Sequence, residues 1–153
     1  MKTSHRTAAH AKRRYQADPM AIFKTMNKVR PFDQNEQLRL NLPVRVSFES
    51  MKTGKGTDDD FHSVAAAVNV AMMMAEKIDP MVEETAIRAR DALVRCLARR
   101  KRTGVWGFDG PALMDIPPAI DLHEQLVANQ TPLQMQKAML EVIRRMDAGE
   151  IEG

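Results

Sequence analysis

Cysteine, tryptophan and tyrosine each occur only once in the 153 residues, and the chain contains no long apolar run. The single cysteine, Cys96, excludes an intramolecular disulfide framework, which is the usual support of small secreted proteins. Residues 1 to 17 are basic but hold no apolar core of a signal peptide. No stretch approaches the roughly 20 apolar residues that span a bilayer. We therefore expect a cytoplasmic protein without a membrane segment.

Motifs for catalysis or metal binding are also lacking. The run Gly54-Lys55-Gly56-Thr57 resembles the end of a phosphate-binding loop, but Thr57 does not directly follow the lysine, and Glu49 stands where the first glycine is required. His123-Glu124 begins like a zinc-protease motif, yet Val127 occupies the position of the second histidine. No acid, base and nucleophile form a readable arrangement. We predict no metal, no cofactor and no enzymatic activity.

Two side chains that could perform chemistry are expected in the core instead. Cys96 falls on the core-facing side of a predicted helix without the signature of a nucleophile, which predicts a buried, inert thiol. His123 lies on an apolar face with Ile120 and Val127, where we expect a histidine that is hydrogen-bonded inside the core.

Methionine is abundant, with 12 residues. Methionine fills irregular gaps in cores and also lines adaptable binding surfaces, so the abundance fits both interpretations. Met72, Met73 and Met74 are consecutive, and helix positions about 100° apart cannot all face one core, so at least one should be exposed or partly exposed. We hypothesise that these three residues and Trp106 contact a partner protein. We also expect Trp106 and Phe108, in a turn-rich connector, to fold back over the helices.

The formal net charge of +3 conceals strong local charge. Residues 1 to 30 hold eight basic residues and one acidic residue, and we interpret residues 1 to 17 as a flexible basic arm. A second basic run follows at residues 99 to 102. An alternative function is therefore nucleic-acid binding by phosphate neutralisation. Its contacts would be Lys2, Arg6, Lys12, Arg13, Arg14, Arg99, Arg100, Lys101 and Arg102.

Helix start signals divide the remaining chain. They are Asp18-Pro19, Asp33 with Glu36, Thr57 with Asp60, Asp79-Pro80, Pro111, and Thr131-Pro132 with Gln134. These signals and the apolar stripes that follow them predict helices over about 19 to 29, 34 to 53, 58 to 78 and 80 to 102, one opening at 111 with a break at Pro117-Pro118, and one ending near 148. The final helix should bury Met135, Met139, Val142, Ile143 and Met146. The prediction is a single all-α domain of about six helices over residues 18 to 148, with a frayed tail at 149 to 153.

Residues 38 to 48 fit two structures. Apolar residues at every second position, from Leu38 to Phe48, are typical of a strand. Leu40, Val44, Phe48 and Met51 also have helical spacing, and no other segment offers a strand to pair with. We therefore favour a helix that is kinked or restarted at Pro43.

Several spaced features together resemble a known family. They are the Asp-Pro start before the first helix, Ala67-Val68-Asn69-Val70-Ala71, Thr103-Gly104-Val105-Trp106, and Asp121-Leu122-His123-Glu124-Gln125-Leu126. Over roughly residues 18 to 146 they resemble small, uncharacterised helical accessory proteins of bacteriophages, prophages and plasmids of proteobacteria. The resemblance implies an accessory protein of a mobile element in a bacterial cytoplasm, which would act by binding a host or phage protein.

Overall fold

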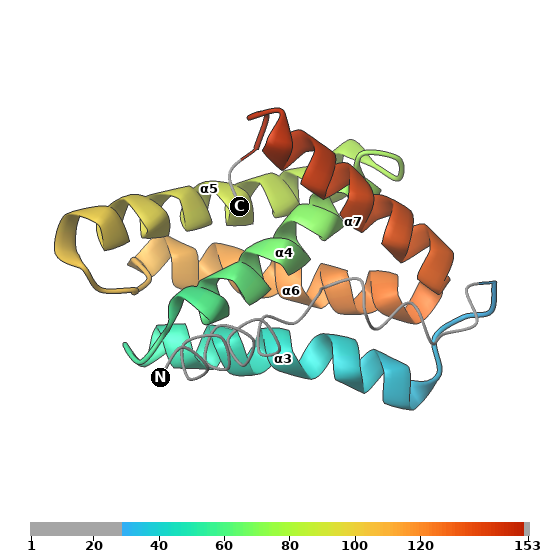
Figure 1. Cartoon of the computed structure of the whole chain (residues 1–153), viewed down its shortest axis with the longest axis horizontal. Coiled ribbons are helices and arrows are strands. Elements are labelled where there is room, and N and C mark those ends of the chain that lie inside the picture. Colours follow the sequence, from blue (N-terminus) through green and yellow to red (C-terminus); the bar gives the residue numbers. More distant parts are fainter. Residues whose placement is uncertain (1–28, 152–153) are drawn as a thin grey trace, which may run out of the picture.

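Every regular element in residues 29 to 151, the part of the chain that the computed structural model describes, is a helix. The predicted all-α class is therefore confirmed for these residues. The elements are α3 (Gln34–Lys52), α4 (Asp58–Ala75), α5 (Pro80–Thr103), α6 (Gly110–Asn129) and α7 (Pro132–Asp147), shown in Figure 1. The predicted basic arm at 1 to 17 lies outside the described residues. So does the helix expected over 19 to 29, except for Val29, which belongs to a turn.

The helix starts follow local capping. Capping boxes close the N-termini of α3, α4 and α7, as predicted, through Asp33 with Glu36, Thr57 with Asp60 and Thr131 with Gln134. Asp79 caps α5, where its Oδ1 accepts a hydrogen bond of 2.7 Å from the Met81 amide. At the other end of α5, Gly104 adopts the left-handed conformation (φ 76°) that ends helices at low steric cost. These signals act within a few residues, so they are readable from sequence.

Internal prolines do not interrupt the helices. Residues 38 to 48 are helical, as favoured, but α3 neither ends nor restarts at Pro43. The break expected at Pro117-Pro118 is also wrong, because α6 continues through both residues. A proline leaves the carbonyl four residues earlier without its helical hydrogen bond. Those carbonyls belong to the exposed residues Arg39, Leu113 and Met114, where water can replace the lost donor.

Helix α4 forms the centre of the fold. Eleven of its 18 residues are buried, and α3, α5, α6 and α7 all pack against it. A helix that is apolar on nearly all sides requires neighbours on nearly all sides. Around it, α5 packs on α6, and α3 also packs on α6 (Figure 1). The fully buried Ala86, Ala89 and Ala92 let α5 approach its neighbours closely.

Helix α7 lies at the edge of this arrangement and packs mainly on α4. Its inner stripe contains the buried Met135 and Val142, as predicted. Ile143 and Met146 were also expected to be buried, but each is 38% exposed. A helix with one main neighbour covers only a narrow stripe, which explains the difference. In the described residues, no helix combines the length and apolarity needed to cross a membrane.

Candidate functional site

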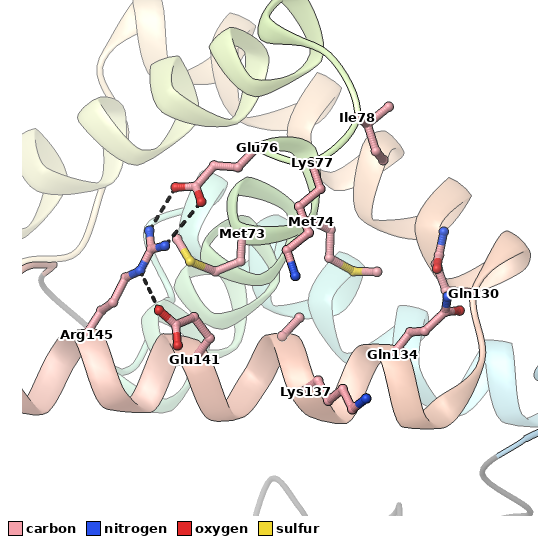
Figure 2. A pocket seen from close by; sticks show the side chains of 11 residues that line it. Met73, Met74, Glu76, Lys77, Ile78, Gln130, Gln134, Lys137, Glu141 and Arg145 are labelled. Atoms are coloured by element: carbon pink, nitrogen blue, oxygen red, sulfur yellow. Dashed lines mark hydrogen bonds and ion pairs between the residues drawn. The ribbon is translucent and has the colours of Figure 1, made fainter.

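A groove of about 600 Å³ opens between the C-terminal end of α4 and α7 (Figure 2). It exists because α4 ends at Ala75, three residues before the predicted end, and a tight turn then leads the chain away towards α5. In that turn the Ile78 amide donates to the Ala75 carbonyl at 2.9 Å. The volume lies in the range of ligand sites. The apolar lining consists of Met73, Met74, Ile78 and Ala138, and the polar lining of Glu76, Lys77, Gln130, Gln134, Lys137, Glu141 and Arg145.

The methionine run divides between core and groove. Met72 and Met73 are buried, while Met74 is partly buried, which confirms that at least one of the three is partly exposed. Met72 points away from the groove, and its sulfur lies 3.7 Å from Nη1 of Arg90 on α5. Met73 and Met74 line the groove with Ala138 (Figure 2). Two flexible thioethers therefore form an apolar floor that can adjust to the shape of a bound group.

Arg145 closes one end of the groove. Its guanidinium donates two hydrogen bonds to Glu76, at 2.8 and 3.1 Å, and its Nε donates to Glu141 at 3.0 Å. The hydrogen bonds from Arg145 lower the pKa of Glu76. Hydrogen bonds from Arg144 and Arg145 lower the pKa of Glu141 to about 2. Both groove carboxylates are therefore ionised at neutral pH and are hydrogen-bonded to arginine.

The groove lining carries one positive charge in excess, because Lys77, Lys137 and Arg145 are set against Glu76 and Glu141. Lys77, in the turn after α4, and Lys137, on α7, form no ion pair with any residue from 29 to 151. In Figure 2 the Lys77 side chain extends between those of Met73 and Met74, and Lys137 projects from α7. Nearby, Gln134 already accepts a hydrogen bond of 2.8 Å from the Thr131 amide, so one of its polar atoms serves the helix cap. The groove thus combines an apolar floor with a net positive rim.

Trp106 lies in the core and does not line the groove. Only 6% of it is exposed, it stacks on Phe61 with ring centroids 4.4 Å apart, and its indole N–H donates to Asp58 at 2.7 Å. Phe108 stacks on Phe48 with centroids 5.3 Å apart, so the expectation that both aromatics fold back over the helices is confirmed. The indole joins the connector after α5 to the start of α4.

In the basic run at residues 99 to 102, at the end of α5, three of the four side chains have no ion pair with the rest of the described protein. Arg99, Lys101 and Arg102 are exposed and have no ion pair within the described part of the chain. Arg100 donates to the Gly104 carbonyl at 2.7 Å and lies over the Trp106 ring, 5.6 Å from its centroid. The predicted contacts Lys2, Arg6, Lys12, Arg13 and Arg14 lie outside the described residues.

Cys96 and His123 lie in the core, as expected. The Cys96 thiol donates to the Gly107 carbonyl at 3.2 Å, and burial raises its pKa, which favours an unreactive thiol. His123 was expected to be hydrogen-bonded, but its buried Nδ1 has no hydrogen-bond partner among the described residues. Burial lowers the pKa of His123 to about 4, so the imidazole is neutral at pH 7. No cluster of possible metal ligands occurs between residues 29 and 151.

Sequence reasoning found only the methionines of this groove. Lys77, Lys137, Glu141 and Arg145 belong to solvent-facing stretches with no distinguishing motif. They come together because α7 crosses the end of α4, with Glu76 and Arg145 separated by 69 positions in the chain. A tertiary contact of that kind has no local sequence signal.

Comparison with known proteins adds no family: no family model, no curated protein and no solved structure matches this chain.

Proposed function

We propose that this chain is a non-enzymatic binding protein that holds a segment of a partner protein in the groove between α4 and α7. The observation that carries the proposal is the groove between two helices, whose apolar floor joins the partly exposed Met74 to the buried Met73. Because of the resemblance described above, we also propose that the protein is an accessory protein of a phage or plasmid. The partner is then a host or phage protein in a bacterial cytoplasm.

The chemistry of the groove favours binding over catalysis. A general acid or base works best with a pKa near the operating pH. Glu76 and Glu141 have lowered pKa values because Arg145 and Arg144 hold them as carboxylates. Ile78 is 56% exposed at the groove, and covering apolar surface contributes roughly 25 cal/mol per Å². An apolar segment of a partner therefore gains most from this site.

Filling the groove is expected to weaken partner binding. Ala138 lines the groove on α7 and is partly buried, so Ala138→Arg places a long side chain over the methionine floor. We expect an affinity loss of about tenfold or more, equivalent to about 1.4 kcal/mol. The measurement is capture of partners by the tagged protein from a bacterial lysate, with and without nuclease, followed by titration of the captured protein.

The matched control is Leu140→Arg, which adds the same side chain on the same helix at a residue that is 52% exposed and does not line the groove. The control should capture the partner as the parent does. Equal capture by Ala138→Arg and the parent would contradict the proposal, and loss of capture on nuclease treatment would favour nucleic acid as the partner.

Nucleic-acid binding remains the second candidate. It is favoured by the exposed, unpaired Arg99, Lys101 and Arg102 at the end of α5. Cations at a helix C-terminus also stabilise the helix through its dipole, so their presence has a structural explanation as well. The binding mechanism would be phosphate neutralisation together with the basic residues of the arm.

Salt dependence tests this candidate. If the five basic residues of the arm each neutralise one phosphate, their contribution to the slope of log affinity against log salt is about −4.5. Replacing Arg99, Lys101 and Arg102 by alanine should flatten the total slope by about 2.7, and deleting residues 1 to 17 should remove the arm's share. The measurement is fluorescence anisotropy with labelled duplex DNA and RNA across a salt series. A slope that neither change alters would exclude these residues as phosphate contacts.

A further inference from the structure

We infer that the segment held between α4 and α7 is acidic and amphipathic, with apolar side chains on the methionine floor and carboxylates beside Lys77 and Lys137. This inference rests on the proposed function, because it specifies the chemistry of the partner segment that the groove accepts.

The charge of the rim carries the argument. The lining holds three basic side chains, Lys77, Lys137 and Arg145, against two acidic ones, Glu76 and Glu141, so its net charge is positive. Arg145 engages both carboxylates through three hydrogen bonds of 2.8 to 3.1 Å, and neither lysine forms an ion pair with a residue from 29 to 151. Lys77 reaches the groove from the turn after α4 and Lys137 reaches it from α7, so a segment bound between the two helices meets both (Figure 2). An ammonium group and a carboxylate form a charge-assisted hydrogen bond, whereas a basic segment would be repelled.

The dimensions suit a short helical segment. The α7 wall runs from Gln134 to Arg145, which corresponds to about 16 Å along a helix axis. A helix of about three turns has this length and presents apolar residues at i, i+3, i+4 and i+7 on one face. Met73, Met74 and Ala138 form a floor of matching character for that face.

Charge also argues against the chain's own N-terminal region as the occupant. Residues 1 to 30 contain eight basic residues and one acidic residue, so they would meet Lys77 and Lys137 with the same sign of charge. A separate acidic partner satisfies both the floor and the rim.

The test uses three synthetic helical peptides with identical leucines on one face. Their other face carries glutamate, glutamine or lysine. Binding to the full chain is measured by fluorescence anisotropy. We expect the acidic peptide to bind about tenfold more tightly than the neutral one, as two ion pairs of up to about 1 kcal/mol each allow, and the basic peptide to bind least. The preference should weaken as salt increases.

Charge reversal identifies the residues responsible. Lys77→Glu with Lys137→Glu should reverse the order of the three peptides. The matched control is Lys52→Glu with Lys55→Glu, which changes the net charge equally at exposed lysines outside the groove and should leave the order unchanged. If the reversed variant melts at a lower temperature than the parent, Lys77→Gln with Lys137→Gln replaces it and should abolish the preference without reversing it.

Three outcomes would overturn the inference. They are binding of no peptide, equal binding of all three, and an acidic preference that survives in the variants of Lys77 and Lys137. None of them decides the proposed function, which fails only if Ala138→Arg keeps the captured partner. If all three peptides bind equally to the parent and Ala138→Arg abolishes that binding, the groove is still a binding site. Only the inferred preference for acidic segments would then be wrong.

Discussion

Replacing Trp106 by alanine is expected to lower the free energy of unfolding by about 3 to 5 kcal/mol. The indole is 94% buried, stacks on Phe61 at 4.4 Å and donates a hydrogen bond of 2.7 Å to Asp58. Alanine removes all of these contacts and leaves a cavity where the connector after α5 meets α4. The measurement is urea denaturation followed by far-UV circular dichroism, because the substitution removes the only tryptophan and with it the fluorescence signal.

Trp106→Phe separates the contribution of the ring from that of the N–H group. Phenylalanine retains a ring for stacking on Phe61 but cannot donate to Asp58. The side chain of Asp58 is 68% exposed and stays hydrated, so the loss should be only about 1 kcal/mol. The prediction is wrong if Trp106→Ala unfolds at the same urea concentration as the parent but no longer captures a partner. That result would support the hypothesis from the sequence that Trp106 contacts a partner protein.

Acidification from pH 7 to pH 5 is expected to lower the free energy of unfolding by about 2 kcal/mol through His123 alone. Burial lowers the pKa of His123 to about 4, against about 6.5 in an unfolded chain. The unfolded state therefore binds a proton at a pH where the folded state does not. The free energy of unfolding is therefore highest above about pH 6.5, and it falls progressively as the pH falls towards 4.

The pH window isolates the histidine from the carboxylates. Glu141, with its pKa lowered to about 2, and Glu76 contribute stability that is present above their ordinary pKa of 4.5 and is lost only below it. Urea denaturation at several pH values between 7 and 5 therefore reports mainly on His123. His123→Leu should remove the pH dependence of the unfolding free energy in this range. Because the buried Nδ1 of His123 has no hydrogen-bond partner among the described residues, the substitution strands no donor or acceptor there. An unchanged dependence in His123→Leu would assign the effect to another group.

Some expectations failed because they treated residues in isolation from their surroundings. A kink or restart was predicted at Pro43 and a break at Pro117-Pro118, yet both helices continue, and the freed carbonyls belong to exposed residues. His123 was placed in the core but given a hydrogen bond that the packing does not supply. Ile143 and Met146 matched the apolar period of α7, but α4 is the main neighbour of α7 among residues 29 to 151, and both side chains are 38% exposed. Periodicity predicts which face is apolar, not how much of it is covered.

The sequence by itself determined the helices and the points where they begin. Capping boxes, Asp-Pro starts and the left-handed Gly104 act over three or four residues, so their energetics are local. Only the tertiary structure decided where the groove lies, because Glu76 and Arg145 meet across 69 positions, and Lys77 and Lys137 reach the same groove from different elements. Contacts between distant residues depend on how whole helices pack, and no local pattern encodes that packing.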